Sequence, residues 1–118
     1  MQTLWIPFRL PGLNEIIAEA RKHKMASAKQ KEYYTSMVKL LATKMKPIKG
    51  RAHYRFTWYE KSRRRNPDNI AGGGEKYILD GLQDAGIIEN DGWGQVASLH
   101  HDFQLGPIEG VKVEIWPI

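Results

Sequence analysis

The sequence contains no cysteine. Disulfide bonds and thiolate metal sites are therefore excluded, and the composition is compatible with a reducing cytoplasm, where we expect the protein to act. No apolar run approaches the roughly 20 residues that a membrane span needs, so we expect no membrane-embedded segment. The opening stretch, "MQTLWIPFRLPGLNE", lacks the basic and long apolar regions of a signal peptide.

Internal repeats, low-complexity tracts and linkers are also missing from the 118 residues, which are about the size of one ordinary domain. The glycine-rich "AGGG" at 71–74 matches neither the dinucleotide-binding pattern nor the P-loop. It indicates either a close approach to a helix start or a flexible joint. No serine has the local context of a nucleophile. We therefore expect one domain over residues 1–118.

Acidic residues are fewer than basic ones, 13 against 18, which gives a net charge of +5 and a pI near 9.5. This excess attracts polyanions, although a ribosomal or membrane-surface protein has a similar balance. Hydrophobic residues make up 42% of the chain. That is enough for a modest core, and the apolar surface left over by so short a chain favours a homodimer.

The hydrophobic pattern predicts four strands and three helices. Period-two alternation indicates strands, and spacing of three to four residues indicates helices. In chain order we expect strand 3–10, helix 15–24, helix 27–46, strand 53–59, helix 75–85, strand 96–103 and strand 111–116. Pro7 makes the first strand an edge strand or ends it. The order β-α-α-β-α-β-β predicts an α/β fold, α+β in stricter usage, with helices packed on a mixed sheet.

The stretch "RRRNPDN" is the most polar part of the chain. Lys61, Arg63, Arg64 and Arg65 place four cations within five residues at the end of a predicted strand. Guanidinium groups pair well with phosphate oxygens. The alternative is a solvated basic loop without a ligand.

Two aspartates flank the third predicted helix. Asp68 precedes it and Asp91 follows it. A pair of carboxylates is the usual protein contribution to a Mg²⁺ site. The two would converge only if both loops that flank the helix lie near one strand end. The alternative is that Asp68 caps the helix and that Asp91, before Gly92, belongs to a turn.

Lys76, Asp80 and Asp84 share one face of this helix, as a surface ion-pair ladder or as part of a metal site. Their spacing does not separate the two interpretations. His100 and His101 are adjacent in a predicted strand and therefore point to opposite faces. We interpret them as structural or surface residues, because they cannot easily share one ion.

The stretch "RRRNPDNIAGGGEKYILDGLQDAGIIENDGW" resembles the RusA family of Holliday junction resolvases, which are small dimeric endonucleases often encoded by phages and prophages. The family signature is a basic run leading into D-x-D-N, a helix that carries a lysine and ends in A-G, and a loop with an aspartate pair. The opening "LPGLNE" and the closing "VKVEIW" also fit, so the resemblance covers nearly the whole chain.

The resemblance implies catalytic and metal-binding roles for Asp68 and Asp91. Lys76 matches the catalytic lysine when the alignment is anchored on "ILDGLQDAG", whereas Gly72 takes that place when it is anchored on "PDN". Asn66 and Asn90 stand where the family pattern has aspartates. Each amide keeps an oxygen for Mg²⁺ but loses a negative charge.

The resemblance further implies that Asn66 assists the metal, with Asp80 as a replacement carboxylate. It implies DNA contacts for Lys61, Arg63, Arg64, Arg65 and Asn69. The expected function is Mg²⁺-dependent cleavage of four-way junctions in recombination and repair, with Mn²⁺ as a substitute and a homodimer as the active form. The alternatives are a catalytically weak or inactive branched-DNA-binding protein of the same fold, and a generic nucleic-acid-binding module.

Overall fold

A computed structural model describes all 118 residues. The elements follow the predicted order, and the fold class is confirmed as α+β. They are β1 (Gln2–Ile6), α1 (Leu13–Lys22), α2 (Lys24–Leu41), β2 (Ala52–Glu60), α3 (Pro67–Asp84), β3 (Val96–Leu105) and β4 (Gly110–Pro117). None of the three helices combines the length and apolarity needed to cross a bilayer.

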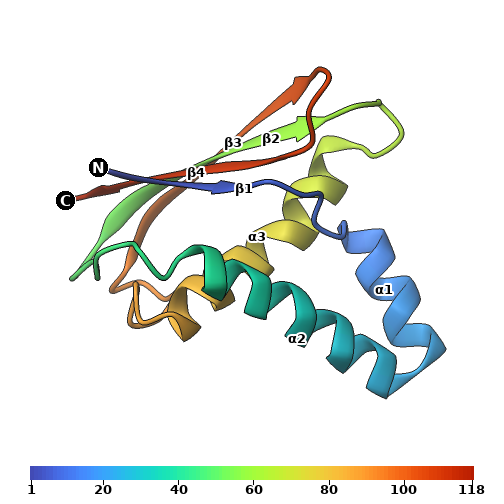
Figure 1. The fold of residues 1–118 in the computed structure, drawn as a ribbon, viewed down its shortest axis with the longest axis horizontal. Coiled ribbons are helices and arrows are strands. Elements are labelled where there is room, and N and C mark those ends of the chain that lie inside the picture. The colour runs from blue at the N-terminus through green and yellow to red at the C-terminus, as the bar shows by residue number, and fades with distance from the viewer.

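The four strands form one mixed sheet in the order β1-β4-β2-β3. β4 is antiparallel to both of its neighbours, β1 and β2, whereas β2 and β3 run parallel. β1 is an edge strand and ends at Ile6, directly before Pro7, as predicted. α2 and α3 cover one face of the sheet, α1 lies beyond the end of the sheet and packs against both helices, and the other sheet face is open (Figure 1).

The core lies between the sheet and the helices. Alternate residues of β2, namely Tyr54, Phe56 and Trp58, are buried against the helices, as the period-two pattern predicts. The other large fully buried side chains come from β1, β4 and the helical layer. They are Ile6, Val38, Ile78, Leu82, Ile88, Val111, Val113 and Ile115.

Two helix starts differ from the prediction. α1 begins at Leu13 after Gly12, and its first turn is capped when Glu15 accepts a 3.2 Å hydrogen bond from the Gly12 N–H. α2 begins at Lys24 rather than at residue 27, because Nδ1 of His23 accepts a 3.1 Å bond from Met25 N–H and so acts as the N-cap.

The start of α3 was predicted wrongly. The helix begins at Pro67 rather than at residue 75, and "AGGG" lies inside it. A Cβ on Gly73 would stand 2.5 Å from the Gly12 carbonyl carbon, and a Cβ on Gly74 would stand 2.6 Å from the Trp58 ring. These glycines are therefore packing residues that let α3 approach α1 and the sheet, and the segment is neither a joint nor a helix start.

The β2-α3-β3 unit decides where the polar residues of α3 lie. Because β2 and β3 are parallel, the helix between them must return along the sheet. The loop that enters α3 therefore lies at the carboxyl ends of β2 and β3, and the loop that leaves α3 lies at the opposite end (Figure 1).

Candidate functional site

Lys76 joins two carboxylates on an exposed part of α3. Its Nζ donates a 2.8 Å hydrogen bond to Oδ2 of Asp91 and lies 3.1 Å from Oδ1 of Asp80. Lys31 of α2 approaches the other oxygen of Asp80 at 3.8 Å. We call Lys76, Asp80 and Asp91 the lysine–carboxylate centre. It unites three residues that the sequence singled out separately.

Helix spacing and a tight turn build this centre. Lys76 and Asp80 are one helical turn apart and therefore share a face of α3. Asp91 comes from the following loop, where Oδ1 of Asn90 accepts a 2.8 Å bond from Gly92 N–H and Gly92 O accepts a 2.9 Å bond from Val96 N–H. The loop thus holds Asp91 over the helix. It also engages the Asn90 oxygen that the family resemblance suggested for a metal.

The charges of the centre stabilise one another. The hydrogen bond to Asp91 raises the pKa of Lys76 above its ordinary value of 10.5, and the bond to Asp80 adds to the effect. The hydrogen bond from Lys76 likewise lowers the pKa of Asp91 below its ordinary value of 3.8. At neutral pH the centre therefore holds an ammonium group between two carboxylates.

The donor set of the centre suits a hard divalent cation in part. The two carboxylates converge on one positive point, as they would on Mg²⁺, and they are partly exposed, Asp80 at 17% and Asp91 at 30%. No group of three His, Cys, Asp or Glu side chains is placed to hold a metal ion. Asp80 and Asp91 therefore offer two carboxylates to a cation, and the rest of a coordination shell would have to come from water or substrate.

Asp68 does not join Asp91, which corrects the predicted pair. Asp68 lies in the first turn of α3 and accepts a 2.9 Å hydrogen bond from the Asn69 N–H. It precedes Lys76 by eight residues, about 12 Å along a helix that rises about 1.5 Å per residue. The cause is the parallel β2-α3-β3 topology, which sends the two loops to opposite ends of the sheet.

Asn66 is the N-cap of α3, with an extended backbone at φ −74° and ψ 150°. The extended conformation agrees with the restriction that Pro67 imposes. Pro67 and Asp68 are already helical, so Asn66 and Asp68 do not point to one side as alternate residues of an extended strand would. Asn66 lines a pocket at the start of α3, far from Lys76, and is not placed to share an ion with Asp91.

Arg65 is a structural residue, not a free phosphate ligand as predicted. Its side chain is only 10% exposed and pairs with Glu60 at 2.8 Å. It also donates a 2.8 Å hydrogen bond to Leu10 O and lies 3.4 Å from Glu15. These contacts tie the loop before α3 to β2 and to the start of α1.

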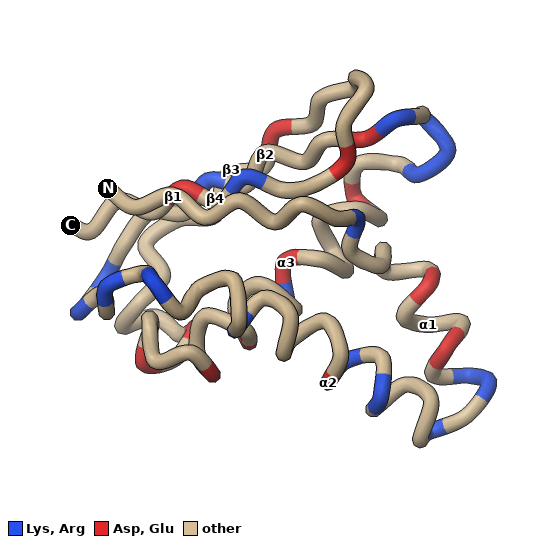
Figure 2. Tube along the Cα trace, viewed as in Figure 1, with Lys and Arg blue, Asp and Glu red and all other residues tan.

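The other basic residues of the loop remain open to solvent. Arg63 and Arg64 form no side-chain ion pair, and Lys61 has only a loose contact with Glu109 at 3.7 Å. This arginine loop lies at the end of the sheet away from both termini (Figure 2). It is the part of the predicted phosphate-binding set that is available to a ligand.

Asn69 also has a structural task. Its Oδ1 accepts a 2.7 Å hydrogen bond from Asn14 N–H in the first turn of α1, so one helix supplies a cap for another. This bond uses the amide oxygen, and the assignment of Asn69 as a DNA contact stays a prediction that concerns its Nδ2 donor.

The contacts of His101 and two exposed aromatic residues were not predicted from the sequence. His101 accepts a 2.9 Å bond from Trp58 Nε1 at Nδ1, and its Nε2 lies 2.9 Å from Glu75. His100 points to the other face of the sheet, as predicted. Trp93, two residues after Asp91, is 91% exposed. Phe103 on β3 is 38% exposed beside the start of α3. Of these residues, only Trp93 could have been noticed in the sequence, because it is an aromatic residue inside the turn "NDGWG".

Comparisons of the sequence with protein-family models and with curated proteins found no match. The function is therefore inferred from the arrangement of the residues, with the resemblance to junction resolvases as a hypothesis.

Proposed function

We propose that the protein is a Mg²⁺-dependent endonuclease that cleaves branched DNA such as a four-way junction. The observation that carries this proposal is the convergence of Asp80 and Asp91 on Lys76, at an exposed position of a basic domain. Carboxylates and a lysine close together are the groups that phosphodiester hydrolysis needs, the first for a metal and the second for phosphate charge.

In this proposal Asp80 and Asp91 would hold the ion. Mg²⁺, or Mn²⁺ in its place, would supply Lewis-acid chemistry when bound. Water is the nucleophile: its oxygen bonds to phosphorus, one P–O ester bond breaks, and the leaving oxygen takes a proton from solvent. Lys76 releases its two carboxylates and turns its ammonium group to the phosphate, where it neutralises charge. Its side chain is 60% exposed, so this movement needs no rearrangement of the core.

Asp68 and Asn66 are left out of the proposed ligand set because they lie at the start of α3, two helical turns or more before Lys76. This choice has a direct test. Loss of cleavage in Asp68→Asn with retention in Asp80→Asn would place the ion at the start of α3 instead.

The net charge of +5 and the exposed Lys61, Arg63 and Arg64 support DNA as the substrate. A symmetric junction has two equivalent strands to cut, and a homodimer with twofold symmetry offers two equivalent sites. We therefore propose a dimer as the active form.

A second candidate is a branched-DNA-binding protein without nuclease activity. It is favoured by the Asn90 oxygen, which is engaged by Gly92 N–H, and by the absence of a third carboxylate at the centre. The amide positions would then have left a binding surface with a weak metal site.

Cleavage of a labelled four-way junction and of a matched linear duplex separates the candidates. We expect paired nicks in the junction with Mg²⁺ or Mn²⁺, none with EDTA, and little cutting of the duplex. Tight junction binding without cleavage in any metal would support the second candidate. Absence of DNA binding would contradict both.

A further inference from the structure

A pocket of about 360 Å³ opens where β2 and β3 end and α3 begins. β2 and β3 are the only parallel neighbours in the sheet. Ligands of open sheets bind outside the carboxyl ends of parallel strands. The pocket is separate from the lysine–carboxylate centre, with which it shares no lining residue.

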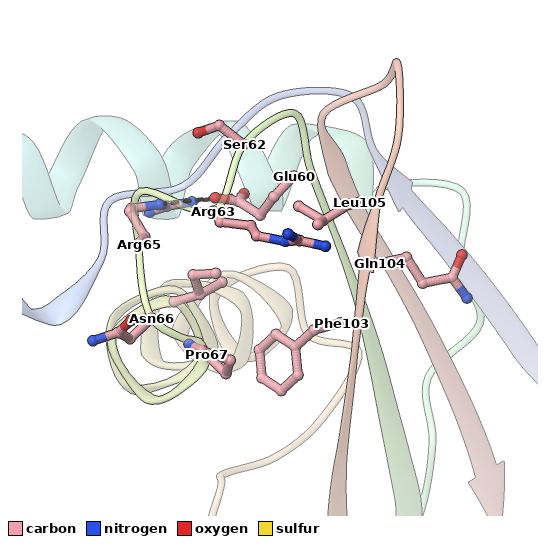
Figure 3. Close-up of a pocket in the computed structure, with 10 residues that line it drawn as sticks. Glu60, Ser62, Arg63, Arg65, Asn66, Pro67, Phe103, Gln104 and Leu105 are labelled. Atoms are coloured by element: carbon pink, nitrogen blue, oxygen red, sulfur yellow. Dashed lines mark hydrogen bonds and ion pairs between the residues drawn. The ribbon is translucent and has the colours of Figure 1, made fainter.

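Two flat groups face this pocket. Figure 3 shows the Arg63 guanidinium on one side and the Phe103 ring on another, with Pro67 beside the ring. Arg63 makes no ion pair or hydrogen bond within the chain, and the Phe103 ring is partly exposed on the edge strand. An unpaired planar cation near an exposed aromatic ring suits a flat aromatic ligand.

The back of the pocket is rigid and its charge is balanced. Glu60 is paired with Arg65 through two hydrogen bonds of 2.8 and 3.0 Å, and both side chains are nearly buried. The carboxylate therefore does not repel an anionic ligand. The unpaired charge in the pocket lining comes from the exposed Arg63, and the exposed Arg64 is its neighbour in the same loop.

We propose that this pocket binds one unpaired nucleotide of branched DNA, with its base stacked against Phe103 and Arg63 and its phosphates at the arginine loop. The inference rests on the proposed function, because it takes DNA as the ligand. Stacking on an aromatic ring tolerates any base, so the pocket would recognise an open base and not a sequence. It would thereby favour branch points over paired duplex.

The test measures DNA binding in EDTA, so that cleavage has no part in it. The probe is a labelled duplex with a single unpaired nucleotide, carrying either a base or an abasic site at that position. We expect the wild-type protein to bind the base-containing probe about tenfold more tightly. Phe103→Leu keeps an apolar side chain but removes the flat ring, and should bind the two probes equally.

Two controls separate stacking from other effects. Leu99→Ala changes a side chain of the same strand with nearly the same exposure, 39% against 38% for Phe103, away from the pocket. It should keep the wild-type preference. Arg63→Lys keeps the charge but removes the planar guanidinium group, so the preference for the base-containing probe should fall. Arg64→Ala should lower the affinity for both probes equally.

Three results would overturn the inference. If the wild-type protein binds both probes equally while still cleaving junctions, the pocket is not a base site and the proposed function stands. If it binds no DNA, both proposals fail. If Phe103→Leu abolishes a concentration-dependent dimer, the pocket is an interface with a second copy of the chain.

Discussion

Lys76 is the residue on which the candidate centre depends, because its ammonium group contacts both Asp80 and Asp91, whereas Lys31 approaches only Asp80. Without it, the two carboxylates would repel each other unless another cation took its place. The lysine thus acts as an internal counter-ion in the absence of metal. Removing the lysine should therefore expose the affinity of the two carboxylates for Mg²⁺, which can be measured through stability without following a reaction.

Replacing Lys76 with methionine should lower the free energy of unfolding by about 0.5–1 kcal/mol in EDTA, a small effect because the lysine is largely exposed. Added Mg²⁺ should stabilise the variant more than the wild type, since the ion no longer competes with the ammonium group. Thermal unfolding with and without Mg²⁺ measures this. Lys112→Met, which removes a cation 3.7 Å from Glu114, is the control and should gain nothing from Mg²⁺.

The pH dependence of the same pair has a definite sign. The pKa of Asp91 is lowered, so its contribution is present above its ordinary value of 3.8 and lost as the pH falls through the lowered value. The pKa of Lys76 is raised, so its contribution is present below 10.5 and lost only at higher pH. The stability difference between wild type and Lys76→Met should be constant from about pH 5 to 9 and vanish in acid. Urea unfolding at several pH values checks this, and an undiminished difference in acid would contradict the pairing.

At the scale of the element, α3 is unusual in carrying three consecutive glycines in its interior. Glycine costs roughly 0.5–1 kcal/mol in a helix relative to alanine. Gly73 and Gly74 offset this cost through close packing on α1 and Trp58, whereas Gly72 has only an ordinary 3.6 Å neighbour in Leu13. Alanine at Gly72 and alanine at Gly73 are therefore expected to change the free energy of unfolding in opposite directions.

Gly72→Ala should stabilise the protein by about 0.5–1 kcal/mol, because it restores helix propensity without a clash. Gly73→Ala should destabilise it by about 1–2 kcal/mol, since the new methyl group would meet backbone atoms of α1 at 2.5–2.6 Å. Urea unfolding of the two variants gives both values. Stabilisation by both would show that α1 does not approach α3 at Gly73.

The glycines also show why the sequence predicted the element order but not the start of α3. Periodicity identifies an apolar face from the chain alone, and it located every strand and helix. The helical state of "AGGG" depends on neighbours that are distant in sequence. The same holds for Asp68 and Asp91, whose separation follows from the parallel pairing of β2 with β3, and for Arg65, which differs from Arg63 only in its surroundings.

At the scale of the whole molecule, positive charge supports binding to a polyanion, and the fold decides which cations take part. Arg63 and Arg64 are free at the end of the sheet, and Arg65 is committed to Glu60. Arg63 and Arg64 are therefore available for ligand binding, whereas Arg65 stabilises the fold. Mutations at these positions should affect either DNA binding or stability, but not both.

Arg63→Ala with Arg64→Ala should leave the unfolding temperature unchanged, weaken junction binding and reduce the slope of log K against log [salt] by about 2. Arg65→Ala should instead lower stability by about 3 kcal/mol, because it leaves Glu60 nearly buried without its partner. Salt-dependent binding and thermal unfolding of both variants measure this. Equal stability losses would contradict the division.

The central claim is that the lysine–carboxylate centre is catalytic, and single-turnover cleavage of a four-way junction by Asp91→Asn in Mg²⁺ tests it most directly. Asp102→Asn is the matched control, since Asp102 also accepts a short bond from a cation, Arg55 at 2.7 Å, but on the open face of the sheet. We expect Asp91→Asn to bind the junction and leave it uncut, while Asp102→Asn cuts at the wild-type rate. Cleavage by Asp91→Asn at the wild-type rate would show that the reaction, if the protein performs it, takes place elsewhere.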